Sequence, residues 1–135
     1  MDGNVIEVSA GLVFRCGFLL ITKRRAKDHL GGLWEFPGGK REGYESDEEC
    51  LRRELREELG IEVEVKELVE NLQHDYAEKS VRLKFFRCAL ISGEPSPVAC
   101  DAVAWVNEAQ LADYAFPEAD QRLLEKLKTS PELWR

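Results

Sequence analysis

Apolar and polar residues alternate near the start of the chain. The apolar positions are Ile6, Val8, Ala10, Leu12 and Phe14. A period of two residues predicts a β-strand with one buried face. A tight turn at residues 15–17 and a short apolar run at residues 18–21 follow. The pattern therefore predicts two neighbouring strands that pair with each other.

A helical pattern occupies the middle of the chain, between Ser46 and Gly60. Ser46 and Glu49 have the spacing of a capping box, and glycine is the residue that most often ends a helix. Residues four positions apart lie on one face of a helix. The apolar residues with this spacing are Leu51, Leu55 and Leu59. We expect a helix of about four turns whose leucines face the core.

Shorter elements are predicted on either side of this helix. Turn-forming residues dominate residues 27–45, which we expect to be a long loop with a functional role. Strands are predicted near residues 61–65, 81–91 and 103–106, with a turn at residues 93–97. Pro117 marks the start of a C-terminal helix with an apolar stripe at Leu123, Leu124 and Leu127. These elements predict one mixed α/β domain spanning residues 1–135.

Composition adds limits on partners and location. The formal net charge of −7 argues against general capture of a nucleic-acid backbone, although a bound divalent cation can reverse the charge of a local site. The four cysteines (Cys16, Cys50, Cys88 and Cys100) have no Cys-x-x-Cys spacing, which indicates free thiols in a reducing compartment. Residues 1–4 do not begin a signal peptide, and no apolar run approaches the roughly 20 residues that cross a bilayer. We therefore expect a cytoplasmic protein.

Acidic residues form a second stripe on the predicted helix. Glu54, Glu57 and Glu58 lie at i, i+3 and i+4, beside the leucine stripe. Neighbouring carboxylates repel one another, so this face is either a solvated charged surface or a site for a hard cation such as Mg²⁺. The glycine-rich loop before the helix and the expected partial burial of Glu58 favour the cation, because a buried acid needs a partner.

These glutamates belong to a longer pattern that resembles the signature of the Nudix family. The matching positions are Gly39, Glu45, Arg53, Glu54, Leu55, Glu57, Glu58, Gly60 and Ile61, and they include every fixed position of the signature. Residues 22–25, 34–40 and 116–120 resemble the MutT branch of the family. That branch includes 8-oxo-dGTP diphosphatases and other (deoxy)nucleoside triphosphate pyrophosphohydrolases.

The resemblance implies an α/β/α sandwich with a mixed sheet between helices. It implies hydrolysis of a (deoxy)nucleoside triphosphate to a monophosphate and pyrophosphate. The expected role is removal of oxidised or non-canonical nucleotides, which is a DNA-repair function. The implied cofactor is Mg²⁺, with Mn²⁺ as an alternative. The implied metal ligands are Glu54, Glu57, Glu58 and the carbonyl group of Gly38. Glu45 and Arg53 complete the catalytic set and are expected to hold the loop and helix in register.

The resemblance also implies a set of substrate-binding residues. They are Arg24, His29, Lys40, Tyr76, Lys79 and Asp120. Arg24 and Lys40 suit phosphate oxygens, and Tyr76 suits stacking on a base. An exposed loop position for His29 and ordinary loop packing for Tyr76 are the alternative interpretations.

The chain departs from the pattern of this branch in two places. Many members have Glu-His where this chain has Ala99 and Cys100, so the general base is left open between Glu57 and another acid of the signature. The 8-oxo-dGTP diphosphatases have Asn where this chain has Asp120. An ionised Asp only accepts hydrogen bonds, so we expect Asp120 to accept from an amino group of guanine or cytosine, or else to favour the start of the last helix as a first-turn acid.

Several functions remain in competition. ADP-ribose, dinucleoside polyphosphates and RNA 5′ triphosphates are alternative substrates, and a non-catalytic nucleotide sensor is an alternative function. The intact signature favours an enzyme, and the MutT-like flanks favour a mononucleotide. We expect a small nucleotide as the binding partner, with no membrane and no stable nucleic-acid complex. The sequence does not determine the oligomeric state.

Overall fold

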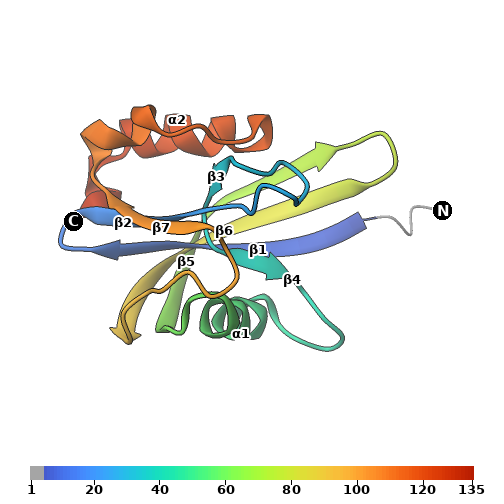
Figure 1. The fold of residues 1–135 in the computed structure, drawn as a ribbon, viewed down its shortest axis with the longest axis horizontal. Coiled ribbons are helices and arrows are strands. Elements are labelled where there is room, and N and C mark those ends of the chain that lie inside the picture. The colour runs from blue at the N-terminus through green and yellow to red at the C-terminus, as the bar shows by residue number, and fades with distance from the viewer. Residues whose placement is uncertain (1–4) are drawn as a thin grey trace.

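The computed structural model describes residues 5–135. Residues 1–4, at which no signal peptide is expected to begin, lie outside the described residues. Within residues 5–135, seven strands form one mixed sheet with a helix on each face (Figure 1). The strands are β1 (Val5–Arg15), β2 (Phe18–Lys23), β3 (Trp34–Glu35), β4 (Gly38–Lys40), β5 (Glu62–Asp75), β6 (Ser80–Ser92) and β7 (Ala102–Val106). The predicted α/β/α sandwich is confirmed.

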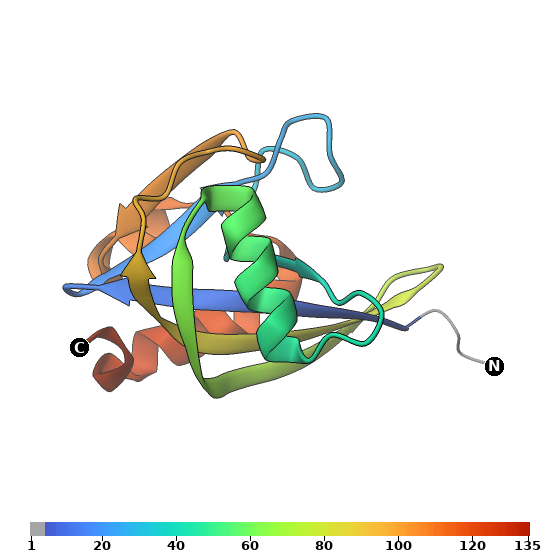
Figure 2. The same ribbon diagram turned by 90° about the horizontal axis from the view of Figure 1, so that it is seen from below.

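Two α-helices and three short 3₁₀ segments complete the fold of the described residues. The helices are α1 (Asp47–Leu59) and α2 (Gln121–Thr129), and the 3₁₀ segments are η1 (Glu108–Asp113), η2 (Glu118–Asp120) and η3 (Pro131–Trp134). Figure 2 shows α1 lying across one face of the sheet, and Figure 1 shows α2 on the other. No helix within residues 5–135 is long and apolar enough to cross a membrane.

Strand β1 is the centre of the sheet. The strand order is β3-β2-β1-β6-β5, with β4 paired to β1 and β7 paired to β2. β1 runs parallel to β6 over most of its length and antiparallel to β2 at residues 14–15, as predicted for the first two strands. The parallel register places Val8 opposite Leu83 and Ala10 opposite Phe85. These cross-strand pairs form the floor of the cleft that holds the candidate site.

Helix α1 begins and ends where its sequence predicts. Ser46 and Glu49 form the reciprocal capping box, with the Glu49 N–H donating to Ser46 Oγ over 3.1 Å. Gly60 ends the helix in the left-handed conformation, with φ of 71°. The three leucines of the predicted stripe, Leu51, Leu55 and Leu59, are completely buried. A rigid, correctly phased α1 therefore fixes the direction of the acidic stripe beside the leucines.

The two faces of the sheet have separate cores. The α1 leucines pack with residues such as Val13 and Leu20, which project from one face. Leu123 and Leu127 of α2 pack against the opposite face and are completely buried, whereas Leu124 is only partly buried. The apolar stripe predicted at Leu123, Leu124 and Leu127 therefore packs against the core, with Leu124 at its edge.

Three predicted boundaries were wrong. Residues 27–45 do not form one continuous loop, because β3 and β4 lie within this segment. β4 can pair with β1 because Gly38 lacks a side chain, and a Cβ atom there would overlap the carbonyl oxygen of Ser9. β5 continues ten residues past the predicted end at Val65, because register shifts between Val65 and Glu70 break the alternation on which the prediction rested. The last helix begins with the 3₁₀ segment η2, so α2 itself starts only at Gln121.

Candidate active site

A cleft of about 410 Å³ lies beside α1, β4 and the segment that precedes α2. Its apolar lining residues are Val8, Ala10, Phe36, Leu83 and Phe85. Its charged lining residues are Arg24, Glu35, Lys40, Glu42, Glu54, Glu58 and Asp120. Gly38 and Gly39 complete the lining. We call this space the cleft.

The floor of the cleft is apolar and rigid. Val8 and Ala10 of β1 pair with Leu83 and Phe85 of β6, so their side chains share one face of the sheet. The ring of Phe36 lies over this floor, with its centroid 6.0 Å from that of Phe85 in an edge-to-face contact. An apolar floor with charged groups around it can bind a flat organic group that carries phosphates.

Glu54 and Glu58 of α1 form the acidic end of the cleft. Glu54 presses so closely on Gly39 that a Cβ atom at position 39 would collide with the Glu54 carboxyl group. Burial raises the pKa of Glu58 to about 8, and the neighbouring charges of Glu35 and Glu54 add to this effect. Burial also raises the pKa of Glu54, in spite of its contact with Arg53. Partly buried, mutually repelling carboxylate oxygens are the donor set that suits a hard divalent cation.

Arg53 joins the acidic helix to the loop before it. Its guanidinium donates to Glu45 Oε1 over 3.0 Å, to Glu54 Oε2 over 3.1 Å and to the carbonyl oxygen of Lys40 over 3.2 Å. Hydrogen bonds from Arg53 are the main reason that the pKa of Glu45 is lowered. This geometry supports the expected role of Glu45 and Arg53 in holding loop and helix in register.

Glu57 stands apart from Glu54 and Glu58. Its side chain is 60% exposed, accepts a hydrogen bond from Arg53 over 3.1 Å and does not line the cleft. Within residues 5–135, no group of three His, Cys, Asp or Glu side chains is gathered closely enough to hold a metal ion. Glu54 and Glu58 are therefore the residues that fit a cation in the cleft. The exposed Glu57 side chain could join them after it leaves its hydrogen bond with Arg53.

Three of the predicted substrate-binding residues line the cleft, namely Arg24, Lys40 and Asp120. The other three, His29, Tyr76 and Lys79, lie outside it. His29 and Lys79 are exposed, and the His29 ring packs edge-on against Tyr76 with centroids 5.8 Å apart. This contact joins the β2–β3 loop to the β5–β6 hairpin and agrees with the packing interpretation of Tyr76.

Asp120 is buried at one side of the cleft, with 7% of its surface exposed. Burial, followed by the charge of Glu35, raises its pKa to about 7. Asp120 is the first residue before α2, yet within the described chain its side chain makes no capping hydrogen bond to this helix. Asp120 does lie at the start of the last helical segment, as the first-turn interpretation requires, and its carboxyl group remains available to the cleft.

Sequence reasoning missed Glu35, Glu42 and the apolar floor. Leu83 and Phe85 lie two residues apart on β6 and face the same side, so the period of two along this strand was the signal that could have found them. Glu35 gave no signal beyond its place in the 34–40 segment. The region of the missing Glu-His pair contributes no acid, because Asp101 lies outside the cleft and accepts a hydrogen bond from the Ala26 N–H over 3.3 Å.

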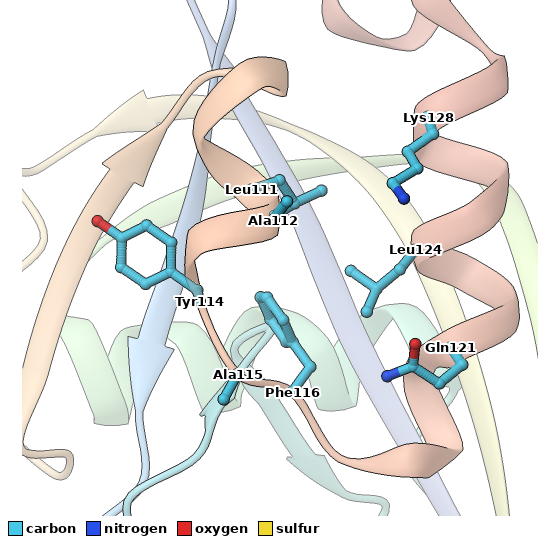
Figure 3. Close-up of a pocket in the computed structure, with 8 residues that line it drawn as sticks. All are labelled: Leu111, Ala112, Tyr114, Ala115, Phe116, Gln121, Leu124 and Lys128. Atoms are coloured by element: carbon cyan, nitrogen blue, oxygen red, sulfur yellow. The ribbon is translucent and has the colours of Figure 1, made fainter.

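A second hollow, of about 340 Å³, lies between α2 and the segment at residues 111–116. In Figure 3, Gln121, Leu124 and Lys128 project from α2 toward this segment, whereas the Tyr114 ring points away from the helix. None of the predicted site residues lines this hollow. The Phe116 ring that borders it stacks on Phe36 of the cleft, with centroids 5.1 Å apart. We assign the chemistry to the cleft, where the charged groups converge.

The sequence and the fold of this chain are similar to those of known proteins. A family model described as NUDIX domain matches residues 9–126. The CTP pyrophosphohydrolase of Escherichia coli (strain K12) is 37% identical over 122 residues, which cover 90% of each chain. An 8-oxo-dGTP diphosphatase of Haemophilus influenzae is 34% identical over 128 residues, which cover 94% of each chain. The solution structure of the E. coli ORF135 protein has a TM-score of 0.81 at 35% identity, covering 94% of this chain and 91% of that one.

The chain therefore belongs to the Nudix family, as its signature predicts. It is a hydrolase that acts on phosphoanhydride bonds, and enzymes of this family generally use divalent metals. The resemblance to the MutT branch is also confirmed, because relatives described as 8-oxo-dGTP diphosphatases and a solved MutT structure at 33% identity match the chain.

Proposed function

We propose that this Nudix hydrolase converts a (deoxy)nucleoside triphosphate and water into a nucleoside monophosphate and pyrophosphate. The observation that carries the proposal is the cleft, where an apolar floor, two cationic side chains (Arg24 and Lys40) and a partly buried acidic end (Glu54 and Glu58) lie side by side. A nucleoside triphosphate requires all three features. Its flat base needs the apolar floor, and its anionic phosphates need the cationic side chains. The acidic end is needed to hold a divalent cation that neutralises phosphate charge during hydrolysis. The relatives' activities on CTP and 8-oxo-dGTP support the same substrate class.

Mg²⁺ is the proposed cofactor, with Mn²⁺ as the alternative. Glu54 and Glu58 would hold it, with Glu57 added after it turns away from Arg53 and the Gly38 carbonyl as a further ligand. The bound cation supplies neutralisation of phosphate charge and a water of lowered pKa. Arg24 and Lys40 then bind phosphate oxygens, and Arg53 and Glu45 keep the loop against α1.

Asp120 is the proposed contact to the base. Its carboxyl group lies in the cleft without a capping bond, and an ionised carboxylate accepts hydrogen bonds from amino groups. Guanine, cytosine and adenine carry such an amino group on their hydrogen-bonding edge, and thymine does not. Among these three bases, the substrates of the relatives, CTP and 8-oxo-dGTP, favour cytosine and guanine. Guanine and cytosine nucleotides, including oxidised forms, are therefore the proposed substrates.

The chain is proposed to act as a single domain in the cytoplasm. All four cysteines are free thiols, and the buried pair, Cys50 and Cys88, has pKa values raised by burial to about 11 and about 12. Such thiols are unreactive at neutral pH and fit a reducing compartment.

The test is a kinetic panel of canonical and oxidised nucleoside triphosphates, measured by pyrophosphate release with Mg²⁺ and with a chelator. We expect turnover that depends on the cation and is fastest on a guanine or cytosine nucleotide. A protein that binds these nucleotides but turns over none of them is a sensor, and that result refutes the proposal.

A further inference from the structure

Glu35 lines the cleft but has no role in the function proposed so far. It is the last residue of β3, where pairing with Thr22 of β2 fixes its backbone. Burial raises its pKa, although Arg24 acts in the opposite direction. A carboxylate in a cleft that receives phosphates adds repulsion, so its place there calls for a function.

Glu35 is bonded to Arg24, which is proposed to bind phosphate. Arg24 Nη1 donates to Glu35 Oε1 over 2.9 Å, and Arg24 Nε donates to the carbonyl oxygen of His29 over 2.7 Å. These anchors come from different segments, β3 and the β2–β3 loop, and together they fix the plane of the guanidinium. Within residues 5–135 they account for every hydrogen bond of the Arg24 side chain, so Nη2 stays available to a ligand in the cleft.

The other acids of the cleft do not share this contact. Glu54 bonds to Arg53, and within the described chain Glu35 is the sole carboxylate in an ion pair with Arg24. A planar guanidinium that is held on two sides loses less freedom when it binds a phosphate than a mobile one does. The repulsion that Glu35 adds is offset by this gain in orientation.

We propose that Glu35 is a positioning residue, which holds the Arg24 guanidinium in the orientation that binds the substrate's phosphate. The inference rests on the proposed function of the cleft. Glu35 itself need not touch the substrate, so its effect passes through Arg24. Two residues that act as one unit give effects that do not add.

The test is a double-mutant cycle in kcat/KM with Glu35→Ala, Arg24→Ala and the double variant. The substrate is the nucleoside triphosphate that the wild-type enzyme hydrolyses fastest with Mg²⁺. Losing a charge-assisted hydrogen bond should cost Glu35→Ala about tenfold to a hundredfold, mostly through KM. In the Arg24→Ala background the same substitution should cost less than about twofold. Glu35→Gln retains an acceptor oxygen and should lose only about threefold.

A matched control is the exposed Arg15–Glu94 ion pair, outside the cleft, with atoms 3.1 Å apart. Glu94→Ala should leave kcat/KM unchanged. Thermal unfolding of each variant separates a folding defect from a lost orientation of the Arg24 guanidinium. If Glu35→Ala does not fold, Glu35→Gln takes its place in the double-mutant cycle. Additive losses in the cycle, or a Glu35→Gln variant as impaired as Glu35→Ala, would overturn the inference. Absence of wild-type turnover would instead refute the proposed function.

Discussion

Glu58 has a strongly perturbed carboxyl group, because burial and two neighbouring acids raise its pKa to about 8. Without a cation this carboxyl group is mostly protonated at neutral pH, and a protonated acid is a poor metal ligand. A bound cation would reverse this state by stabilising the ionised form. The electrostatic cost in the folded chain is therefore the physical basis for assigning Glu58 to the cation.

Substitution by glutamine tests both the acid of α1 that lines the cleft, Glu58, and the exposed acid beside it, Glu57. Glu58→Gln and Glu57→Gln should each lower kcat by about two orders of magnitude or more, because each replaces a charged ligand oxygen with a neutral amide. Glu57 is 60% exposed, so its substitution should leave thermal unfolding unchanged. Steady-state kinetics with saturating Mg²⁺ measures this. A near-normal kcat in Glu57→Gln would show that Glu57 keeps its contact with Arg53 during turnover.

Asp120→Asn tests which group contacts the base. The substitution adds a donor and removes a charge, so the relative kcat/KM for guanine, cytosine and 8-oxoguanine nucleotides should change by about tenfold or more. The same nucleotide panel measures the effect. Glu125→Gln, an exposed substitution on α2, is the control and should leave the order of substrates as it is. An unchanged order in Asp120→Asn would exclude Asp120 from base recognition.

The sequence predicted the acidic residues of the site better than its shape. Glu54 and Glu58 were found because helical spacing fixes which side chains share a face. The outward position of Glu57 could not be predicted in this way, because its contact with Arg53 depends on rotamers that spacing does not determine. Glu35 and Asp120 approach each other only through the pairing of β3 with β2 and the path of η2, and neither is local in sequence.

At the scale of elements, the contact between β4 and α1 shapes the acidic end of the cleft. Gly39 allows the Glu54 carboxyl group to lie against the backbone of β4. Gly60, by contrast, ends α1 with φ of 71° and would meet no neighbour through a Cβ atom. These two glycines therefore have separable functions, the first in the site and the second in the stability of the helix.

Alanine at each glycine separates these functions. Gly39→Ala should lower kcat/KM by at least about tenfold, because its methyl group displaces Glu54. Gly60→Ala should lower the free energy of unfolding by about 1 kcal/mol, because alanine is strained in the left-handed conformation, and should retain activity. Urea unfolding and steady-state kinetics measure both effects. Full activity in Gly39→Ala would contradict the proposed packing of Glu54.

The sequence predicted α1 completely because its signals are local, namely the capping box, the leucine period and Gly60. The length of β5 was missed because its bulges interrupt the alternation of side chains. β4 was missed because a strand with two glycines has no hydrophobic pattern, and its pairing with β1 depends on a close approach that only the folded sheet reveals.

At the scale of the whole molecule, the raised carboxyl pKa values link stability to pH. Burial raises the pKa of Glu58 from its ordinary value of 4.5, which applies in the unfolded chain, to about 8, and it raises the pKa of Asp120 from 3.8 to about 7. Between these values the folded protein holds protons that the unfolded chain has released. The stabilising contribution is therefore complete below the unfolded values and is lost as pH rises through the folded values.

The melting temperature should show this dependence. Without divalent cations the protein should melt at a lower temperature at about pH 8 than at about pH 6. Mg²⁺ should raise the melting temperature more at the higher pH, because protons compete with the cation for Glu58. Glu58→Gln should remove most of the cation effect. An equal or larger Mg²⁺ effect at the lower pH would contradict the assignment of Glu58.

The most direct measurement of the central claim is the identity of the products of nucleoside triphosphate hydrolysis, followed by ³¹P NMR in the presence of Mg²⁺. A pyrophosphohydrolase releases nucleoside monophosphate and pyrophosphate in equal amounts, and the reaction stops when the cation is chelated. Release of nucleoside diphosphate and inorganic phosphate, or no turnover of any nucleoside triphosphate, would contradict the account.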